Sequence, residues 1–325
     1  MVADMTPPEG AQSFLAAHGW QGADILPLAG DASFRRYFRV VAAGRQAVLM
    51  DAPPAHEDAR PFIAIARHLR GLGFLAPEIL AEDLESGLVL IEDFGDARMA
   101  EVLAQDPARE AGIYARAVDL LLALAKHPPA EGLRAYDLAE YLREAELFTE
   151  WYAPALSLDV DVEGYRTAWT GVLAHLLGHQ SVTVLRDYHA ENIMLVEDGA
   201  RLGLLDFQDA LSGHPAYDLV SLLQDARREV DAELEAAMLR RYRSGASLDG
   251  AAYAILGAQR NAKILGIFCR LWKRDGKPRY LAYQQRVWRY LERDLAHPAL
   301  APVTNWFARN IPYAARGAAW ETLPA

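Results

Sequence analysis

The first hundred residues alternate short apolar segments with turns that contain glycine or proline. Segments of strand length separated by such turns are typical of a meander of strands. An apolar stripe at helical spacing runs from Phe62 to Leu69 behind Pro61, which predicts a helix. The other elements expected here are a short helix over residues 11–20, an extended piece from Pro77, and strands over residues 25–28, 34–41, 46–50 and 88–91.

Beyond residue 97 the apolar positions follow helical spacing, except around residues 182–206. There, two short apolar segments with the character of buried strands, 182–185 and 202–205, flank a tight turn at 197–199. Helices are expected over residues 110–126, 137–152, 163–178, 216–228, 230–243, 249–272 and 278–295. The pattern predicts the α+β class, with a small antiparallel β-rich N-lobe over residues 1–94 and a large, mainly helical C-lobe over residues 95–325.

Charge and composition narrow the kinds of partner. The chain has 325 residues and a net charge of -11, which argues against nucleic acid as the main partner because phosphate binding needs clustered cations. No apolar run approaches the ~20 residues that cross a bilayer. The N-terminus has no Lys or Arg before Arg35, unlike a signal peptide, and Cys269 is the single cysteine. We therefore expect a cytoplasmic protein with no intrachain disulfide and no membrane contact.

Three polar residues stand at a spacing that points to chemistry. Asp187 is followed five residues later by Asn192, and a strand, a turn and a second strand then lead to Asp206. Phosphoryl transfer needs a carboxylate beside the attacking hydroxyl and oxygen ligands for the magnesium that bridges the phosphates. A solvated surface loop would explain any one of these residues alone. Together, between two buried strands, they favour a phosphotransfer site.

This spacing resembles the catalytic and metal loops of protein-kinase-like enzymes, in the variant of the aminoglycoside phosphotransferase family. The sequence has Leu185, Arg186 and Asp187 in the first loop, and Asp206, Phe207 and Gln208 in the second. The resemblance covers about residues 28–295. It implies a protein-kinase-like bilobal fold, an N-terminal nucleotide-binding lobe, a C-terminal catalytic lobe, and ATP and Mg²⁺ as cofactors.

The resemblance also implies roles for individual residues. Asp187 would be the catalytic base, while Asn192 and Asp206 would hold the magnesium. His189 would point toward the γ-phosphate, although a histidine that merely props the loop is an equally good explanation. The other residues implied to bind the nucleotide are the hinge residues Glu92, Asp93 and Phe94, through their backbone groups, and Gly30 and Ser33 of the phosphate-covering turn.

The sequence departs from the family on the third strand, where a lysine should reach the phosphates. Met50 or a neighbour stands in that place, and no lysine precedes Lys126. Because an arginine can grip phosphate with two donors, we expect Arg35 or Arg36 to replace the lysine. A solvated arginine on an edge strand is the alternative.

A finer resemblance links the chain to one subgroup, the anomeric kinases for N-acetylmuramate and N-acetylglucosamine in bacterial cell-wall recycling. It rests on residues 28–39, 51–54, 206–210 and 217–225. It implies ATP-dependent phosphorylation of the C1 hydroxyl of the amino sugar to an α-1-phosphate, which a uridylyltransferase would then use.

Candidate substrate-binding residues follow from their places in the sequence. Gln208 and Asp209 come directly after the expected metal ligand. Asp225 lies seven residues after Asp218, so one helix would present both on the same face, where Asp225 could bind sugar hydroxyls. A polar stripe on an otherwise apolar helix could bind an anionic lactyl group, or could simply be solvated; its members are Arg260, Asn261 and Lys263, with Arg270 further on.

Two alternatives stay open at this point. One is a kinase of another small-molecule alcohol, such as an aminoglycoside, choline or homoserine. The other is a nucleotide-binding pseudokinase, which Met50 favours and the intact Asp187, Asn192 and Asp206 oppose.

Overall fold

The computed structural model describes residues 6–28 and 34–320. It divides into two compact units, one formed by Met1–Pro107 with Glu191–Ala210, the other by Ala108–Ala190 with Leu211–Ala325. The chain therefore crosses from one unit to the other three times. This grouping differs from a division at residue 94, because the segment 191–210 packs with the N-terminal residues rather than with the helices that flank it in sequence.

The first unit is built on a five-stranded antiparallel sheet with the strand order β1-β2-β3-β5-β4. The strands are β1 (Asp24–Pro27), β2 (Arg36–Ala42), β3 (Arg45–Asp51), β4 (Ile79–Asp83) and β5 (Leu88–Glu92). The expected strands are thus confirmed. The extended piece after Pro77 leads into a fifth strand, β4, which forms an edge of the sheet.

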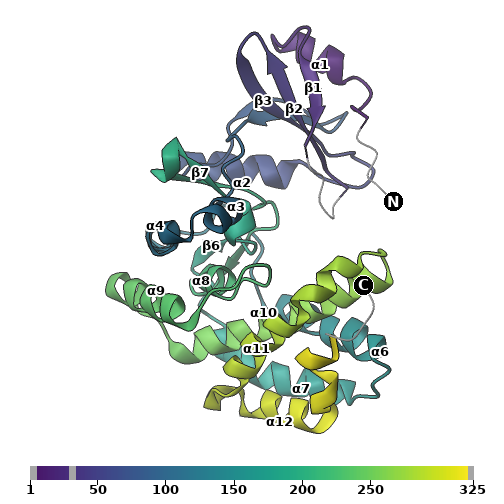
Figure 1. Cartoon of the computed structure of the whole chain (residues 1–325), viewed down its shortest axis with the longest axis vertical. Helices are drawn as coiled ribbons and strands as arrows, with labels where there is room; N and C mark the ends of the chain where they lie inside the picture. The colour runs from purple at the N-terminus through teal and green to yellow at the C-terminus, as the bar shows by residue number, and fades with distance from the viewer. Residues whose placement is uncertain (1–5, 29–33, 321–325) are drawn as a thin grey trace. The chain divides into compact units, whose positions relative to one another are not determined.

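Side chains alternate between the two faces of this sheet. On one face, Phe38 and Val40 of β2 and Leu49 of β3 pack with Leu15 and Trp20 in a buried cluster under α1 (Ala11–Ala17), which lies beside the sheet in Figure 1. Residues two apart on β2 point to the same face of the sheet. Arg36 therefore lies on the α1 face with Phe38, whereas Tyr37 and Arg39 lie on the opposite face.

In Figure 1, α2 lies beside the sheet, and the remaining elements of this unit lie beside α2. They are α2 (Arg60–Gly71), α3 (Met99–Gln105) and the antiparallel hairpin of β7 (Ile193–Val196) and β8 (Arg201–Leu204). The hairpin is tied to the N-terminal part of the chain by Leu195 N–H, which donates to Ala97 C=O at 2.7 Å, and by Leu204 N–H, which donates to Leu75 C=O at 2.8 Å.

The second unit is mainly helical, as expected. Its longest helix, α10, is buried over most of its length although it carries Arg260, Asn261 and Lys263. The helices are α4 (Glu110–Leu124), α5 (Leu138–Ala145), α6 (Ala153–Ala155), α7 (Val162–Leu173), α8 (Tyr217–Leu223), α9 (Ala232–Gly245), α10 (Gly250–Lys273), α11 (Gln284–Leu295) and α12 (Ala301–Asn310). A short pair of strands, β6 (Val182–Val184) and β9 (Leu211–Gly213), completes it.

Several expected helices are shorter than the sequence suggested; the one expected over 163–178, for example, ends at Leu173. The helix expected over 137–152 ends at Ala145 and continues as a π-turn over Phe148–Tyr152, and the one expected over 278–295 begins with a 3₁₀ segment. The helix expected over 216–228 ends at Leu223. The last difference matters for the candidate site, because it removes Asp225 from the helix that carries Asp218. Within the described residues, no helix is long and apolar enough to span a membrane.

Candidate active site

The residues singled out by the sequence are divided between the two units. Asp187 and His189 belong to the second unit, and the chain passes into the first unit between Ala190 and Glu191. Asn192, Asp206, Gln208 and Asp209 therefore belong to the first unit, which also contains the hinge residues and the arginines Arg35 and Arg36. Gly30 and Ser33 lie outside the described residues.

The β7–β8 hairpin brings Asn192 and Asp206 together at its open end. Ile193 pairs with Leu204, and Leu205 N–H donates to Asn192 C=O at 3.0 Å. The Asn192 amide nitrogen lies 3.2 Å from an Asp206 carboxylate oxygen. Asp206 adopts a left-handed backbone with φ 58, a conformation that non-glycine residues adopt rarely and that is often found at functional sites.

Hard oxygen donors at one hairpin end fit magnesium, which usually takes one or two protein carboxylates together with water and substrate phosphates. The described residues contain no group of three or more His, Cys, Asp or Glu that could hold a metal ion without such partners. The donor set of Asn192 and Asp206 therefore fits a magnesium ion that is bound together with a nucleotide, rather than a metal held by the protein alone.

The next two residues lie beside this pair. The Gln208 amide donates to Asp206 at 2.9 Å and to Asp209 at 3.4 Å. Phe207, between them, is fully buried, and its ring stacks on Phe62 of α2 at 5.1 Å. The buried Phe207 ring anchors the backbone of the loop, and the Gln208 amide then links the carboxylates of Asp206 and Asp209.

The hinge residue Glu92 is the last residue of β5, and its carboxylate is bound by other groups of the protein. Arg70 of α2 lies 3.0 Å from it, and the backbone N–H of Glu78 donates to the same oxygen at 3.1 Å. This carboxylate closes the turn between α2 and β4. A ligand at this position would therefore meet the backbone of Glu92 rather than its side chain.

The side chains of Asp93 and Phe94 are engaged in the same way. Asp93 accepts from Arg39 at 2.6 Å and from the N–H of Gly95 at 2.8 Å. The Phe94 ring packs on β8, where a Cβ on Gly203 would come within 2.7 Å of it. Both side chains are therefore occupied within the protein, and recognition of the nucleotide by the backbone groups of the hinge stays a prediction.

Arg36 and Arg35 lie in different surroundings. Arg36 faces α1, where its Nε lies 2.8 Å from an Asp51 carboxylate oxygen across the β2–β3 pair and one guanidinium nitrogen reaches Thr6 C=O at 3.1 Å. Arg35 is 8% exposed and pairs with Glu57 at 3.0 Å.

Tyr37 connects Arg35 to Asp206. Burial raises the pKa of Tyr37 to about 12; the positive charge of Arg35 lowers it in part, and the negative charge of Asp206 adds to the rise. Arg35, Tyr37 and Asp206 therefore share one neighbourhood within the first unit. Glu57 and Tyr37 were missed by the sequence analysis, since nothing along the chain shows that they meet Arg35.

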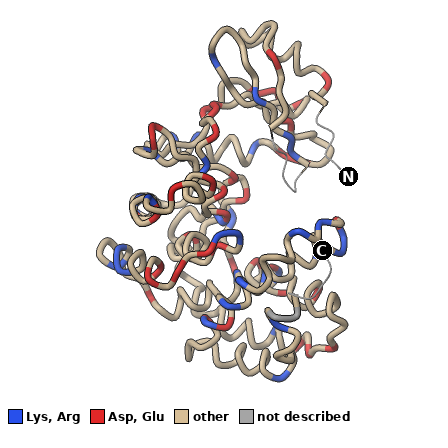
Figure 2. Tube along the Cα trace, viewed as in Figure 1, with Lys and Arg blue, Asp and Glu red and all other residues tan. Residues whose placement is uncertain are grey.

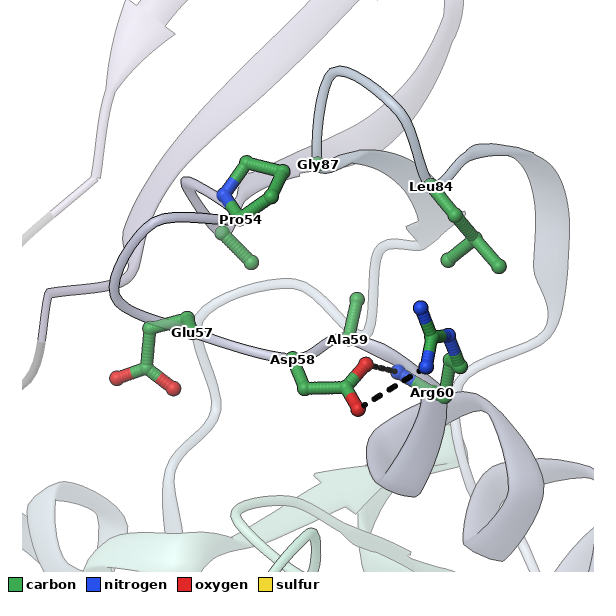
Figure 3. A pocket seen from close by; sticks show the side chains of 8 residues that line it. Pro54, Glu57, Asp58, Ala59, Arg60, Leu84 and Gly87 are labelled. Atoms are coloured by element: carbon green, nitrogen blue, oxygen red, sulfur yellow. Dashed lines mark hydrogen bonds and ion pairs between the residues drawn. The ribbon is translucent and has the colours of Figure 1, made fainter.

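Glu57 also lines a pocket at the start of α2, shown in Figure 3. Asp58 and Arg60, on the same wall, pair with each other at 3.7 Å. Gly87 closes the opposite wall in a left-handed conformation, and a Cβ there would lie 2.1 Å from Ala52 C=O. The charged groups of this pocket are paired locally, and none of its residues was expected to bind a ligand, although Ala52 and Pro54 belong to the segment 51–54 that carries the finer resemblance.

In the second unit, Asp187 sits in a loop held by α8. The buried carboxylate of Asp218 accepts from the N–H groups of Leu185 at 2.7 Å and Arg186 at 2.9 Å. Burial raises the pKa of Asp218 to about 7, although these two donors lower it. Arg186 has a left-handed φ of 71, so the loop turns sharply just before Asp187.

Cations surround Asp187 and keep it ionised. Burial opposes ionisation, but the positive charges of Lys263 and Arg260, followed by that of Arg186, hold the pKa of Asp187 below its ordinary value. A carboxylate that stays ionised at neutral pH can orient a hydroxyl and accept its proton.

His189 is buried beside Arg227, whose guanidinium lies 3.2 Å from the ring Nε2. Burial lowers its pKa to about 4, and Arg227 lowers it further while Asp225 opposes the shift. The ring is therefore neutral near pH 7. This favours the explanation in which His189 supports the loop over one in which it supplies a positive charge to phosphate.

Asp225 does not stand on a helix face with Asp218, which corrects the sequence expectation. It lies just after α8, and its carboxylate accepts from the N–H of Arg227 at 2.8 Å and of Ala190 at 3.3 Å. These bonds replace the helical ones, which is why the helix stops. Asp225 is 1% exposed and braces the loop that carries Asp187.

The polar stripe on α10 is buried, so it is no solvated helix face. Arg260 donates to Ser221 at 2.6 Å and Lys263 lies 2.7 Å from Glu144. Asn261 turns away from them into an interior network, where it donates to Gln224 at 2.7 Å and contacts Asp294 at 3.4 Å. The structure brings Arg260 and Lys263 to Asp187 and gives Asn261 a position that favours a structural role.

Glu144 of α5 is a charged residue that the sequence analysis missed. It is 1% exposed and binds Lys263, Arg186 and the Tyr136 hydroxyl. Burial would raise its pKa, but Lys263 and Arg186 lower it to about 2. Its sequence neighbours Tyr141, Leu142 and Ala145 mark the buried face of α5, and an acid beside them was the available signal.

Comparison with known proteins now defines the class. A family model described as the phosphotransferase enzyme family matches residues 24–255, and the chain belongs to this family. Solved structures with the same fold include a choline/ethanolamine kinase family protein from Mesorhizobium loti, with a TM-score of 0.62 and 20% identity over 91% of this chain and 98% of that chain. A type VIII aminoglycoside-3'-phosphotransferase has a TM-score of 0.52 and 18% identity over 77% and 97% of the two chains. They confirm the protein-kinase-like fold.

Relatives of higher identity carry a narrower name. The N-acetylmuramate/N-acetylglucosamine kinase of Pseudomonas aeruginosa is 41% identical, covering 90% of this chain and 91% of its own. The protein of the same name from Caulobacter vibrioides is 37% identical, over 94% and 96% of the two chains. The resemblance found in the sequence to the aminoglycoside phosphotransferase family, and to this subgroup, is confirmed.

Proposed function

We propose that this protein is an ATP-dependent amino-sugar kinase that phosphorylates the anomeric C1 hydroxyl of N-acetylmuramate, N-acetylglucosamine or both. The product would be the α-1-phosphate, formed in the cytoplasm during peptidoglycan recycling and suited to a following uridylyltransferase. The observation that carries the proposal is Asp187, a buried carboxylate kept ionised by neighbouring cations. The choice of sugar rests on relatives that are 41% and 37% identical over nearly the whole chain.

Asp187 would act as the base. An anomeric hydroxyl is more acidic than an ordinary alcohol, so a carboxylate can accept its proton as the oxygen attacks phosphorus. The backbone contacts of Asp218 hold the loop before the attack, which reduces the conformational freedom that the reaction must overcome.

Asn192 and Asp206 would hold magnesium through their side-chain oxygens, with Gln208 keeping the Asp206 carboxylate oriented. The ion supplies charge neutralisation on the phosphates. Within the first unit, residues 1–94 would bind the nucleotide, with the backbone of residues 92–94 against the adenine; Gly30 and Ser33, expected at the phosphates, lie outside the described residues.

Arg35 would take the place of the missing lysine. It lies in the neighbourhood of Asp206 through Tyr37, whereas Arg36 is bound to Asp51 on the α1 face. The pair Arg35–Glu57 would hold the guanidinium ready for phosphate, as an acid holds the lysine in protein kinases.

Among the candidates for sugar binding, Gln208, Asp209, Arg260 and Lys263 keep that role in the proposal. Arg260 and Lys263 already act on Asp187 by their charge. The proposal does not extend to Asn261, Asp225 and His189, whose contacts support the interior and the loop.

A substrate panel tests the function. Purified protein with ATP and magnesium is offered N-acetylmuramate, N-acetylglucosamine, choline, homoserine and an aminoglycoside, and products are read by phosphorus NMR. We expect a signal from a phosphate bonded at C1 with the amino sugars alone. Phosphorylation of choline, homoserine or the aminoglycoside in preference to the sugars, or of no substrate at all, would refute the proposal.

A further inference from the structure

The last turn of α10 and the segment that follows it are strongly basic. Residues 270–279 contain five cations and one acid in a chain whose net charge is -11. Figure 2 shows Lys and Arg gathered at this end of the helix. The cations are Arg270, Lys273, Arg274, Lys277 and Arg279.

Arg270 lies on the same face of α10 as Lys263. The seven residues between them make two helical turns, or about 10 Å along the axis. Lys263 is among the cations that act on Asp187. Ile267, half-buried, lies between the two on this face. A molecule whose hydroxyl is at Asp187 could therefore extend along α10 toward Arg270.

Arg270 differs from the other cations of this face in its partners. Arg260 donates to Ser221, and Lys263 pairs with Glu144. Within the part of the chain that the structure describes, the side chain of Arg270 makes neither a hydrogen bond nor an ion pair, although it is half-buried and its Nε is fully enclosed. A partly buried cation without a partner is unfavourable until an anion reaches it.

The charges around Arg270 also favour an anion. Burial lowers its pKa, and the like charges of Arg274 and Arg143 lower it further, against the opposing charges of Asp275 and Glu150. Asp275 is bound by Arg274 at 2.6 Å and 3.0 Å, so its charge is already paired.

We propose that Arg270 binds a carboxylate of the sugar substrate and so distinguishes N-acetylmuramate, which has an anionic lactyl group, from N-acetylglucosamine, which has none. This inference rests on the proposed function. A planar guanidinium can hold a carboxylate with two parallel hydrogen bonds, which gives both affinity and orientation. Arg260 and Lys263 lie nearer Asp187 and serve the reacting end of the sugar, whereas Arg270 serves the lactyl end.

The test compares both sugars in each enzyme preparation. Arg270→Gln removes the charge and keeps a polar side chain of similar length, while Arg270→Lys keeps the charge without the two-pronged donor. Lys273→Gln is the matched control, because it removes one charge from the same helix end, where the Lys273 ammonium lies 3.6 Å from the centre of the Trp272 ring.

We expect Arg270→Gln to lower kcat/KM for N-acetylmuramate by about 10-fold or more through KM, because it removes one charge-assisted contact. The value for N-acetylglucosamine should stay within about 2-fold, which also shows that the variant is folded. Arg270→Lys should recover part of the loss, and Lys273→Gln should resemble the wild type.

The outcomes separate this inference from the proposed function. If the wild type phosphorylates neither sugar, the proposed function fails, and this inference falls with it. If the wild type is active but uses only N-acetylglucosamine, or if Arg270→Gln affects both sugars equally or neither, the inference about Arg270 is overturned while the kinase assignment stands.

Discussion

The ammonium of Lys263 lies 2.7 Å from the carboxylate of Glu144, a residue 119 positions earlier in the chain. Both side chains are largely buried, and Lys263 is also the foremost of the cations that lower the pKa of Asp187. One cation thus acts on two acids. Glu144 therefore acts on Asp187 through Lys263 and Arg186 and is a positioning residue for the proposed reaction.

Glu144→Gln should alter the pH dependence of the reaction. Without the charge of Glu144, Lys263 and Arg186 act on Asp187 alone, so the pKa of Asp187 falls further. We expect the acid limb of the kcat profile to move to lower pH, and kcat at neutral pH to fall about 3- to 10-fold because a weaker base accepts the proton. Glu140→Gln, on the same helix, should leave the profile unchanged; an unshifted limb in Glu144→Gln would exclude the positioning role.

The same substitution should reduce stability in a pH-dependent way. It leaves two buried cations uncompensated, which costs roughly 3 kcal/mol. The pKa of Glu144 is about 2 in the folded protein, below its ordinary value of 4.5. Its contribution is therefore fully present above pH 4.5 and is lost as the pH falls toward 2. Denaturant unfolding should show the difference between wild type and variant shrinking over that range, and a constant difference would contradict this account.

Asp187→Asn should fold normally and lose nearly all transfer. It removes the proton acceptor and leaves the proposed magnesium ligands, so kcat should fall about 10²- to 10⁴-fold while nucleotide binding persists. Turnover measured with saturating sugar, together with calorimetric titration of ATP and magnesium, checks both parts. Turnover close to that of the wild type would rule Asp187 out as the base.

Asp206→Ala should weaken nucleotide binding mainly when magnesium is present. The lost carboxylate is a hard oxygen ligand, and its effect should depend on the ion. Titrations of ATP with magnesium and with EDTA provide the comparison, and Asp198→Ala, in the turn of the same hairpin, is the control. An equal loss of affinity under both conditions would exclude Asp206 as a metal ligand.

Arg35 and Arg36 should separate in their effects. Arg35→Ala should lower kcat and raise KM for ATP about 10-fold or more, because a charge-assisted contact to phosphate is lost; Arg35→Lys should recover part of this. Arg36→Ala removes the partner of Asp51 and should reduce the melting temperature with little change in KM for ATP. Normal ATP kinetics in Arg35→Ala would show that the phosphates are held without this side chain.

The sequence by itself determined those features that depend on neighbours along the chain. Strand and helix periodicity predicted the α+β class and most elements, because alternation and helical spacing are local properties. The spacing from Asp187 to Asn192 and Asp206 predicted the loop and hairpin, since Asn192 and Asp206 flank two strands whose pairing, Ile193 with Leu204, brings them together. The same alternation along β2 places Arg36 and Tyr37 on opposite faces of the sheet.

Only the tertiary structure decided which face of β2 is covered by α1. It also decided which polar side chains bind other groups inside the protein and so are not available to a ligand. Arg36 lies on the face that α1 covers, and α1 reaches it through contacts between distant segments. Asp225, Asn261 and Glu144 look alike as polar residues in a sequence. Asp225 braces the loop of Asp187, Asn261 binds Gln224, and Glu144 pairs with Lys263. A buried polar side chain cannot bind water, so protein groups must take the place of water as its hydrogen-bond partners. These groups come from remote parts of the chain, and they determine the role of each side chain.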